Sequence, residues 1–231
     1  MSRWLKTILF LLGSAFLTHL IPFSSFFRNL DTMIHEFGHA VVTLLLSGHV
    51  MNMQLNADHS GVTYSSVTRA WALIPIGLAG YISASLFALL LFYLGSRGKQ
   101  RLGLQLVTAL AAITLVLFVH SGFGFFWLIG FIVLNVIVML LGRSIRNFYY
   151  LLLAFLTLEE SVFGPVTLVI YGMTSPGQAG DAANLARTTL VPAVVWALLF
   201  TIIALWCAKG ALGYFFGGRR KRTSAPPSYY Q

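Results

Sequence analysis

The sequence predicts an all-α polytopic integral membrane protein with roughly six to seven transmembrane helices and a short β-hairpin. Hydrophobic residues make up 58% of the 231-residue chain and charged residues only 9%, whereas soluble domains carry about 25% charged residues. Apolar runs close to 20 residues long recur along the chain, and this length spans a bilayer. Intrinsic disorder is excluded because disordered chains have low hydrophobicity.

The apolar runs give the expected spans in order. The first run follows Arg3 and Lys6 and resembles a signal peptide, but no small-residue cleavage site follows it, so we expect an uncleaved helix. The second run is shorter and is interrupted by polar residues, which makes it an anomalous helix. The seven runs are 5–23, 31–46, 70–94, 102–119, 123–141, 148–171 and 190–216.

Residues 1–216 are expected to form a single membrane-embedded domain. Within it, residues 50–68 alternate partly between apolar and polar residues around an Asn-Ala-Asp-His-Ser-Gly turn. This pattern is typical of a β-hairpin, and a plain polar loop is the alternative. The remaining segment, 217–231, is basic and then rich in Pro and Ser, so it is expected to be a disordered tail.

The charge distribution indicates sidedness rather than nucleic-acid binding. The formal net charge is +9, from 15 Lys and Arg against 6 Asp and Glu, but the basic residues lie in short clusters between apolar runs, as in cytoplasmic loops. If seven helices span, the clusters at 97–101, 143–146 and 219–222 lie on one side. We therefore predict a multi-pass protein of the cell (plasma) membrane with a cytoplasmic C-terminus. The topology of the N-terminus and the oligomeric state stay open.

The candidate catalytic residues lie in the stretch His35-Glu36-Phe37-Gly38-His39, on an expected helix over residues 31–47. Residues four apart share one helical face, so both imidazoles can reach one Zn²⁺. Glu36 would then act as the general base that activates a zinc-bound water. The alternative is a pair of buried, hydrogen-bonded histidines. Three ionisable groups in one turn of a membrane helix favour the functional interpretation.

The motif His-Glu-Phe-Gly-His-Ala within a membrane helix resembles the site-2-protease class of intramembrane zinc metalloproteases, and more narrowly the M50B-like peptidases. Weaker matching blocks are Gly61-Val62-Thr63, Leu78-Ala79-Gly80-Tyr81 and the segment 180–186, so the resemblance extends over about residues 32–199. It implies a Zn²⁺ cofactor held by His35, His39 and Asp181, and a transmembrane protein as substrate.

The third metal ligand has rival candidates, because catalytic zinc needs three protein ligands and an open position. Asp181 is favoured by the resemblance, but an Asp before Ala-Ala-Asn could instead cap a helix. Glu159 and Glu160 lie mid-way along an expected span. Glu159 is roughly 17 Å and His39 roughly 12 Å along their helices from the same side, whereas threading of seven spans puts Asp181 on the opposite side.

The predicted function is therefore an intramembrane zinc metalloprotease that hydrolyses peptide bonds in or near transmembrane segments. Such a substrate must be unwound, because a helix uses its carbonyl groups in its own hydrogen bonds. The hairpin could hold the substrate extended by strand addition. The alternative is a metal-binding membrane protein without protease activity, either a transporter or an inactive regulatory relative.

Overall fold

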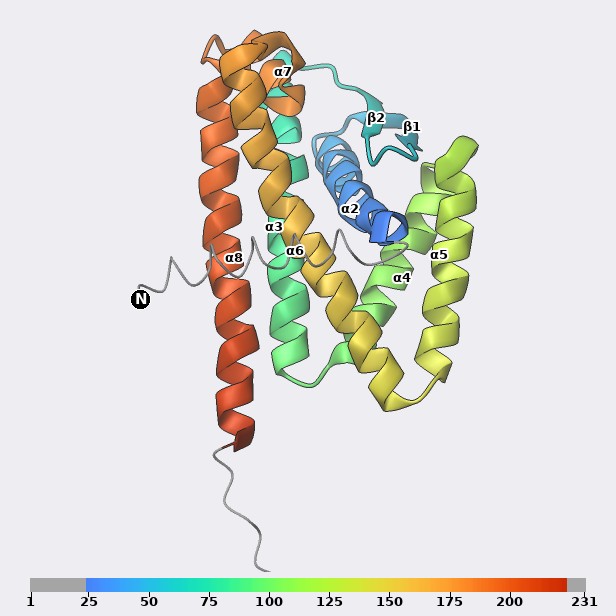
Figure 1. Ribbon diagram of the computed structural model, residues 1–231. Helices are drawn as coiled ribbons and strands as arrows, with labels where there is room; N and C mark the ends of the chain where they lie inside the picture. The colour runs from blue at the N-terminus through green and yellow to red at the C-terminus, as the bar shows by residue number, and fades with distance from the viewer. Residues whose placement is uncertain (1–23, 224–231) are drawn as a thin grey trace, which may run out of the picture.

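The structure is a computed structural model that describes residues 24–223, so the expected span 5–23 lies outside the described residues. The described chain is a helical bundle with one hairpin (Figure 1). Its elements in chain order are α2 (Ser24–Leu45), β1 (His49–Leu55), β2 (Gly61–Ser66), η1 (Ala70–Ala72), α3 (Leu73–Ser96), α4 (Gln100–Leu117), α5 (Gly122–Leu140), α6 (Arg143–Thr174), η2 (Pro176–Gln178), α7 (Gly180–Thr189) and α8 (Ala193–Thr223).

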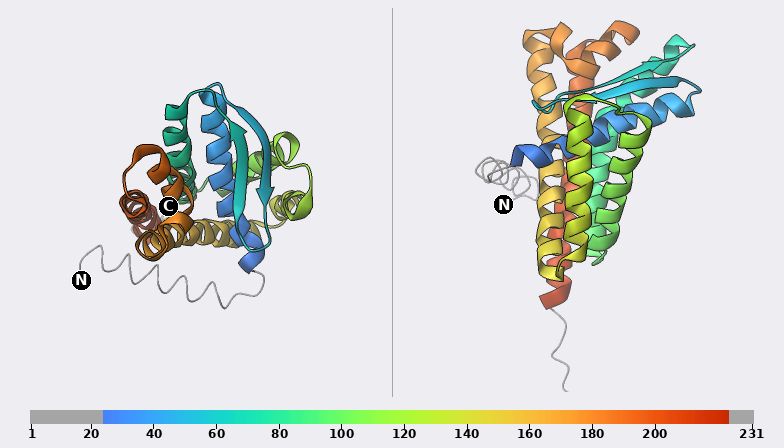
Figure 2. Two further views of the ribbon diagram at one scale, coloured as in Figure 1. Left: turned by 90° about the horizontal axis from the view of Figure 1, so that it is seen from above. Right: turned by 90° about the vertical axis from the view of Figure 1, so that its right-hand side faces the viewer.

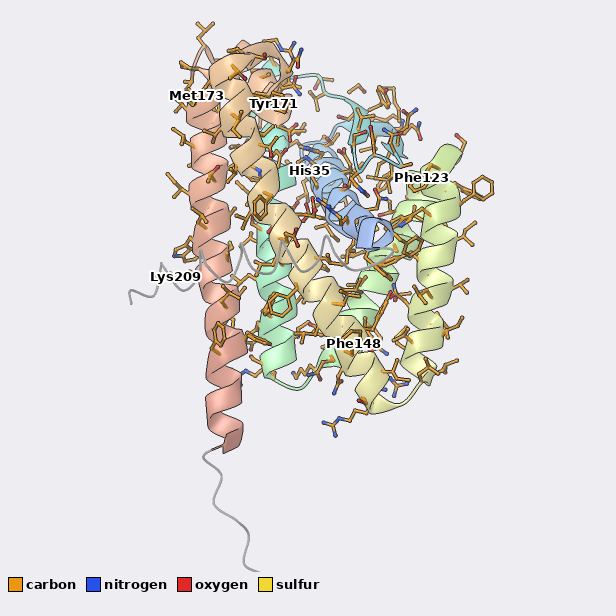
Figure 3. All side chains as sticks on the ribbon, viewed as in Figure 1. His35, Phe123, Phe148, Tyr171, Met173 and Lys209 are labelled. Atoms are coloured by element: carbon orange, nitrogen blue, oxygen red, sulfur yellow. The ribbon has the colours of Figure 1, made fainter. Side chains whose placement is uncertain are left out.

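Five helices of the described chain are long and apolar enough to cross a membrane, namely α3 with its preceding turn, α4, α5, α6 and α8. They correspond to the five expected spans from 70–94 onward, which confirms a multi-pass α-helical membrane protein. Apolar side chains such as Phe123, Phe148 and Met173 point outward from the bundle (Figure 3), as expected of a surface that faces lipid. The anomalous second run does form a helix, α2, but α2 is not among these five.

The bundle is arranged around α2, which does not run parallel to the other helices. Helices α3, α6 and α8 pack against one another, and α4 and α5 lie on the side away from α8 (Figure 1). Helix α2 crosses obliquely through the upper half of the bundle, with the hairpin over it (Figure 2). A helix with this many polar residues is poorly suited to face lipid, and its oblique path keeps most of its polar groups inside the protein.

The hairpin predicted over 50–68 is confirmed. Strands β1 and β2 pair antiparallel from His49 opposite Ser66 to Leu55 opposite Gly61. Val50, Met53 and Leu55 of β1 are buried, whereas Met51 is exposed, which agrees with the partial alternation in the sequence. On its other edge β1 is fixed to the bundle, because the Met53 amide donates to the carbonyl oxygen of Phe118 at 2.9 Å.

Helices α2 and α3 approach each other closely at a pair of small residues. A Cβ atom at Gly38 would lie 2.1 Å from Ser83 Oγ and 2.9 Å from the carbonyl oxygen of Ala79, so only glycine fits. This contact brings the histidine-bearing turn of α2 against the first half of α3. Small residues at helix crossings are typical of membrane proteins, where close packing replaces the hydrophobic driving force.

The short helix α7 is anchored by a small hydrophobic core of its own. Ala182 and Leu185 are buried against Leu168 of α6 and Phe200 of α8. Leu185 also packs against α3, where a Cβ atom at Gly77 would come within 3.0 Å of it. Helix α7 is therefore held at one end of the bundle, beside the start of α3, by apolar contacts with three helices.

The boundaries at the C-terminal end differ from expectation. The expected span 190–216 begins instead at Ala193, because Leu190 adopts a left-handed conformation (φ 63°) that ends α7. Helix α8 then continues to Thr223. The segment 217–223, expected to be the start of a disordered tail, is therefore helical, and residues 224–231 lie outside the described residues.

Candidate metal centre

Helix α2 places His35 and His39 side by side, as their spacing predicts. Their Nε2 atoms lie 3.0 Å apart, and the two rings meet edge to face with centroids 4.7 Å apart. Figure 3 shows His35 in the interior of the molecule, below the hairpin. The two ring nitrogens are thus aimed at one point rather than at separate partners.

Asp181 reaches the same point from the first turn of α7. Its Oδ2 atom lies 3.0 Å from His35 Nε2 and 3.2 Å from His39 Nε2. Asp181 does not cap α7, because the residue in the cap position is Ala179 and no side chain caps the helix. Burial acts to raise the pKa of Asp181, but the charge of His39 and the hydrogen bonds from both histidines hold it well below its ordinary value. Asp181 is therefore ionised, the form in which a carboxylate binds metal.

The three side chains fit a zinc ion. Their ligand atoms lie within 4.8 Å of one another. In the described part of the chain, these residues are the one group of three or more His, Cys, Asp or Glu side chains that could hold a metal ion. Neighbouring ligand atoms in tetrahedral zinc sites, with bonds of about 2.0–2.1 Å, are about 3.3 Å apart. The observed separations of 3.0–3.2 Å are close to this value. Three such atoms form one face of a tetrahedron and leave the fourth position open.

The histidines are oriented by groups on α3. His39 Nδ1 lies 2.7 Å from the carbonyl oxygen of Ile76, so a neutral His39 carries its proton on Nδ1 and offers the Nε2 lone pair to a metal. His35 packs edge to face on the Tyr81 ring, with centroids 4.5 Å apart. Between them lies Gly80, where a Cβ atom would come within 2.5 Å of His35 Nε2 and 2.6 Å of His39 Nε2. The absence of a side chain at Gly80 is what allows the two rings to meet.

Glu36 lies beside the cluster and is held by the hairpin. Its side chain is buried, with 4% of the residue exposed. The Thr63 hydroxyl donates to Glu36 Oε2 at 2.7 Å, and Gly61 leaves room for the carboxylate. A buried carboxylate next to a metal-type cluster has the position required of a general base.

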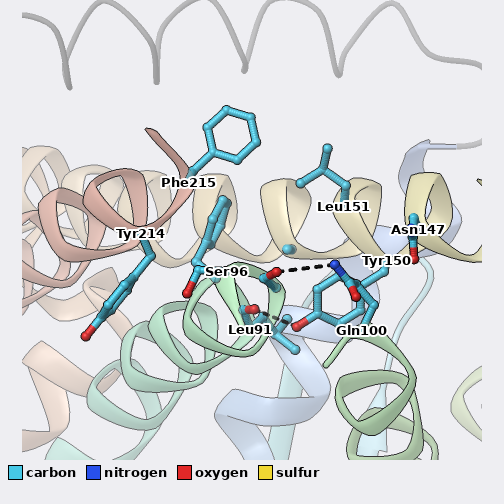
Figure 4. A pocket seen from close by; sticks show the side chains of 11 residues that line it. Leu91, Ser96, Gln100, Asn147, Tyr150, Leu151, Tyr214 and Phe215 are labelled. Atoms are coloured by element: carbon cyan, nitrogen blue, oxygen red, sulfur yellow. Dashed lines mark hydrogen bonds between the residues drawn. The ribbon is translucent and has the colours of Figure 1, made fainter. Parts of the chain in front are cut away.

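Two cavities adjoin the cluster and share Glu36 and Asp181 in their linings. One, of about 470 Å³, lies between β2, the start of α3 and α7, and is lined by Glu36, His39, Thr63, Asp181 and Arg187. The other, of about 290 Å³, is lined by Asp31, Tyr81 and Glu160 as well as His35 and Asp181. A third cavity, of about 240 Å³, lies at the other end of the bundle around Tyr150 and Tyr214 (Figure 4), and no Asp, Glu or His lines it.

The rival carboxylates do not join His35 and His39 in the cluster. Glu160 forms an ion pair with Arg28 of α2, and Glu159 is buried within α6. Neither belongs to the cluster of ligand atoms. The depth argument in their favour fails because α2 crosses the bundle obliquely, so that distance along α2 does not measure depth (Figure 2). The same obliquity brings the histidines to the end of the bundle where α7 lies, and removes the expected separation from Asp181.

Several contacts of the site had not been predicted. The ring of Tyr81, the carbonyl oxygen of Ile76 and the ion pair of Arg28 carry no sequence signature of their own. The sequence features nearest to these residues are the short blocks Gly61-Val62-Thr63 and 78–81, which match the family pattern but do not by themselves indicate a role.

The fold and the cluster together define a multi-pass membrane protein that encloses a buried site of two histidines and two carboxylates. The chain belongs to the Peptidase M50B-like family, whose model matches residues 7–211 and so includes every element of the site. This confirms the resemblance seen in the motif of α2, and family membership supports a peptidase. No curated protein and no solved structure matches the chain.

Proposed function

We propose that the protein is an intramembrane zinc metalloprotease in which His35, His39 and Asp181 hold the metal. The observation that carries the proposal is the convergence of three ligand atoms from α2 and α7, at separations of 3.0–3.2 Å, directly beside a buried glutamate. A metal-binding protein without protease activity would need the ligands but not Glu36. The buried carboxylate therefore favours hydrolysis over mere binding.

In the proposed hydrolysis, Glu36 and His39 have different roles. Zinc, when bound, would polarise a water molecule and lower its pKa toward 7. Glu36 would accept a proton from the attacking water and later donate it to the leaving amine. The carbonyl oxygen of Ile76 would keep the proton of a neutral His39 on Nδ1, so that Nε2 would be available to hold the metal.

The substrate is a transmembrane protein segment, held extended along β2. The cavity of about 470 Å³ runs between β2 and α7, with Glu36 and Asp181 in its lining. In the described part of the chain, the backbone bonds of β2 outside its own strand are confined to its pairing with β1. A peptide that pairs with the free edge of β2 would expose its carbonyl groups to the site, as hydrolysis requires.

The protein resides in the lipid bilayer of the cell (plasma) membrane, with its C-terminus in the cytoplasm. The turn between α3 and α4, the turn between α5 and α6 and the end of α8 lie at one end of the bundle, opposite the hairpin (Figure 1). These are the regions that carry the basic clusters 97–101, 143–146 and 219–222. Because all three basic clusters lie at the same end of the bundle, the positive-inside rule supports a cytoplasmic location for that end.

The test is Glu36→Gln in purified, zinc-loaded protein. Gln is isosteric and leaves both histidines intact, so zinc content should remain at the wild-type value. Cleavage of a model transmembrane substrate should fall by about 10²–10⁴-fold, the usual contribution of a general base. Wild-type protein that contains no zinc, or a Glu36→Gln variant that cleaves at the wild-type rate, contradicts the proposal. Zinc without cleavage in the wild type would favour the binding alternative.

A further inference from the structure

We propose that Thr63 is a positioning residue that fixes the Glu36 carboxylate for proton transfer, so that the hairpin is part of the catalytic machinery. This inference rests on the proposed function, because it assigns to Thr63 an effect that acts through Glu36. It adds a second role to the hairpin, whose other role is to hold the substrate.

The contact between hairpin and carboxylate is direct. The Thr63 hydroxyl lies 2.7 Å from Glu36 Oε2 and 3.1 Å from the Glu36 carbonyl oxygen, so one hydroxyl meets both ends of the same residue. Hydrogen bonds to an ionised carboxylate are about twice as strong as neutral ones. Since a carboxylate offers roughly four lone-pair sites, this bond leaves others free to accept the proton of the attacking water.

Gly61, two residues before Thr63 on the same strand, also shapes the space around the Glu36 carboxylate. A Cβ atom at Gly61 would lie 2.7 Å from Glu36 Cγ and 2.8 Å from Oε1. Thr63 thus engages one carboxylate oxygen while Gly61 gives space to the other. Glu36 has three rotatable side-chain bonds, and the hydrogen bond from Thr63 limits the orientations that its carboxylate can adopt beside the cluster.

The hydroxyl of Thr63 is not needed to attach the hairpin. The Met53 amide donates to the carbonyl oxygen of Phe118 at 2.9 Å, and the Thr32 hydroxyl donates to the carbonyl oxygen of His59 at 2.8 Å. A further hydroxyl contact, between Thr43 and Ser65 at 3.4 Å, joins α2 to β2 without involving Glu36. Loss of the Thr63 hydroxyl should therefore release the carboxylate and leave the hairpin docked.

The location of Thr63 also links substrate binding to the base. Thr63 lies on β2 and in the lining of the cavity between β2 and α7. A peptide that pairs with β2 is aligned by the same strand that orients Glu36. The strand thereby sets the distance between the scissile bond and its base, and misplacement of about 1 Å at such a site can cost 10²-fold in rate.

The experiment compares Thr63→Val, Thr63→Ser and Thr43→Val in zinc-loaded full-length protein. Val is isosteric with Thr but lacks the hydroxyl, and Ser restores it. Thr63→Val should keep its zinc and its Tm, leave KM within about twofold, and lower kcat by about 10- to 100-fold. Thr63→Ser should recover most of kcat. The control Thr43→Val, which removes the other hydroxyl contact between α2 and β2, should retain a wild-type kcat.

A double variant separates positioning from mere packing. In the Glu36→Gln background, Thr63→Val should cause little further loss, because two residues that act through one step are not additive. The inference is overturned if Thr63→Val has a wild-type kcat, if Ser fails to rescue, or if the two losses multiply. Should Glu36→Gln itself cleave normally, the proposed function fails and this inference with it. Should Glu36→Gln be inactive while Thr63→Val is normal, only this inference fails.

Discussion

Replacement of Gly80 by alanine should remove zinc from the protein although none of the three ligand residues is replaced. The added Cβ atom would lie 2.5 Å from Cε1 and Nε2 of His35 and 2.6 Å from Nε2 of His39. Ordinary contacts begin at 3.4 Å, so the ring edges must retreat by about 0.9 Å. Functional metal sites tolerate deviations of only about 0.2 Å in ligand distance.

The magnitudes decide that metal binding suffers more than folding. Changes in groups that merely orient metal ligands cost about 10–100-fold in affinity, and a direct displacement of two ligands should reach at least the upper end. Overpacking costs about 1–3 kcal/mol, but replacing Gly by Ala inside a helix returns about 1 kcal/mol. The free energy of unfolding of the apoprotein should therefore fall by no more than about 2 kcal/mol, whereas zinc affinity falls by about 100-fold or more.

The assay is zinc stoichiometry and competition against a chelator, together with the Tm of the apoprotein. Gly130→Ala on α5 is the matched control, because a Cβ atom there meets nothing within 4 Å. Gly130→Ala should bind zinc as the wild type does. A Gly80→Ala variant with full zinc content at wild-type affinity would show that the two histidines do not share one ion.

Two further predictions concern the ligands themselves. His35→Ala and His39→Ala should each lose zinc in metal analysis while still inserting into membranes, because two protein ligands hold zinc poorly; full stoichiometry in either variant would exclude that histidine. Asp181→Asn should lower zinc occupancy and abolish cleavage, because a neutral amide is a poor zinc ligand, whereas Glu160→Gln should retain zinc because Glu160 pairs with Arg28. If Asp181→Asn keeps both zinc and activity, Asp181 is not a ligand.

The sequence predicted those features that depend on local pattern. Apolar runs of sufficient length marked the five spanning helices of the described chain, and alternation around a turn marked the hairpin. The i, i+4 spacing places His35 and His39 on one face of a helix, although the close approach of their Nε2 atoms also needs the space left by Gly80.

Features that depend on the packing of distant elements were not predictable. Length and composition indicate that a segment is helical, but its inclination is set by its neighbours, here by the contact of Gly38 with α3. The position of Asp181 depends on how Leu185 and Phe200 anchor α7. For the same reason a depth argument based on spans alone favoured Glu159 and Glu160. The bond between Thr63 and Glu36 joins two residues that no periodicity connects.

The origin of the third ligand has a consequence for the dynamics of the molecule. If Asp181 and His39 bind one ion, the ion cross-links segments separated by about 140 residues, and closing so long a loop is entropically costly. In the apoprotein the docking of α7 rests on its small apolar core and on the contacts of Asp181 with the two histidines, without a metal cross-link. Helix α7 should then be among the first elements to open, and its amides should gain hydrogen-exchange protection when zinc is added. Metal binding would thus make α7, one wall of the cavity between β2 and α7, more rigid, in addition to supplying the metal to the site.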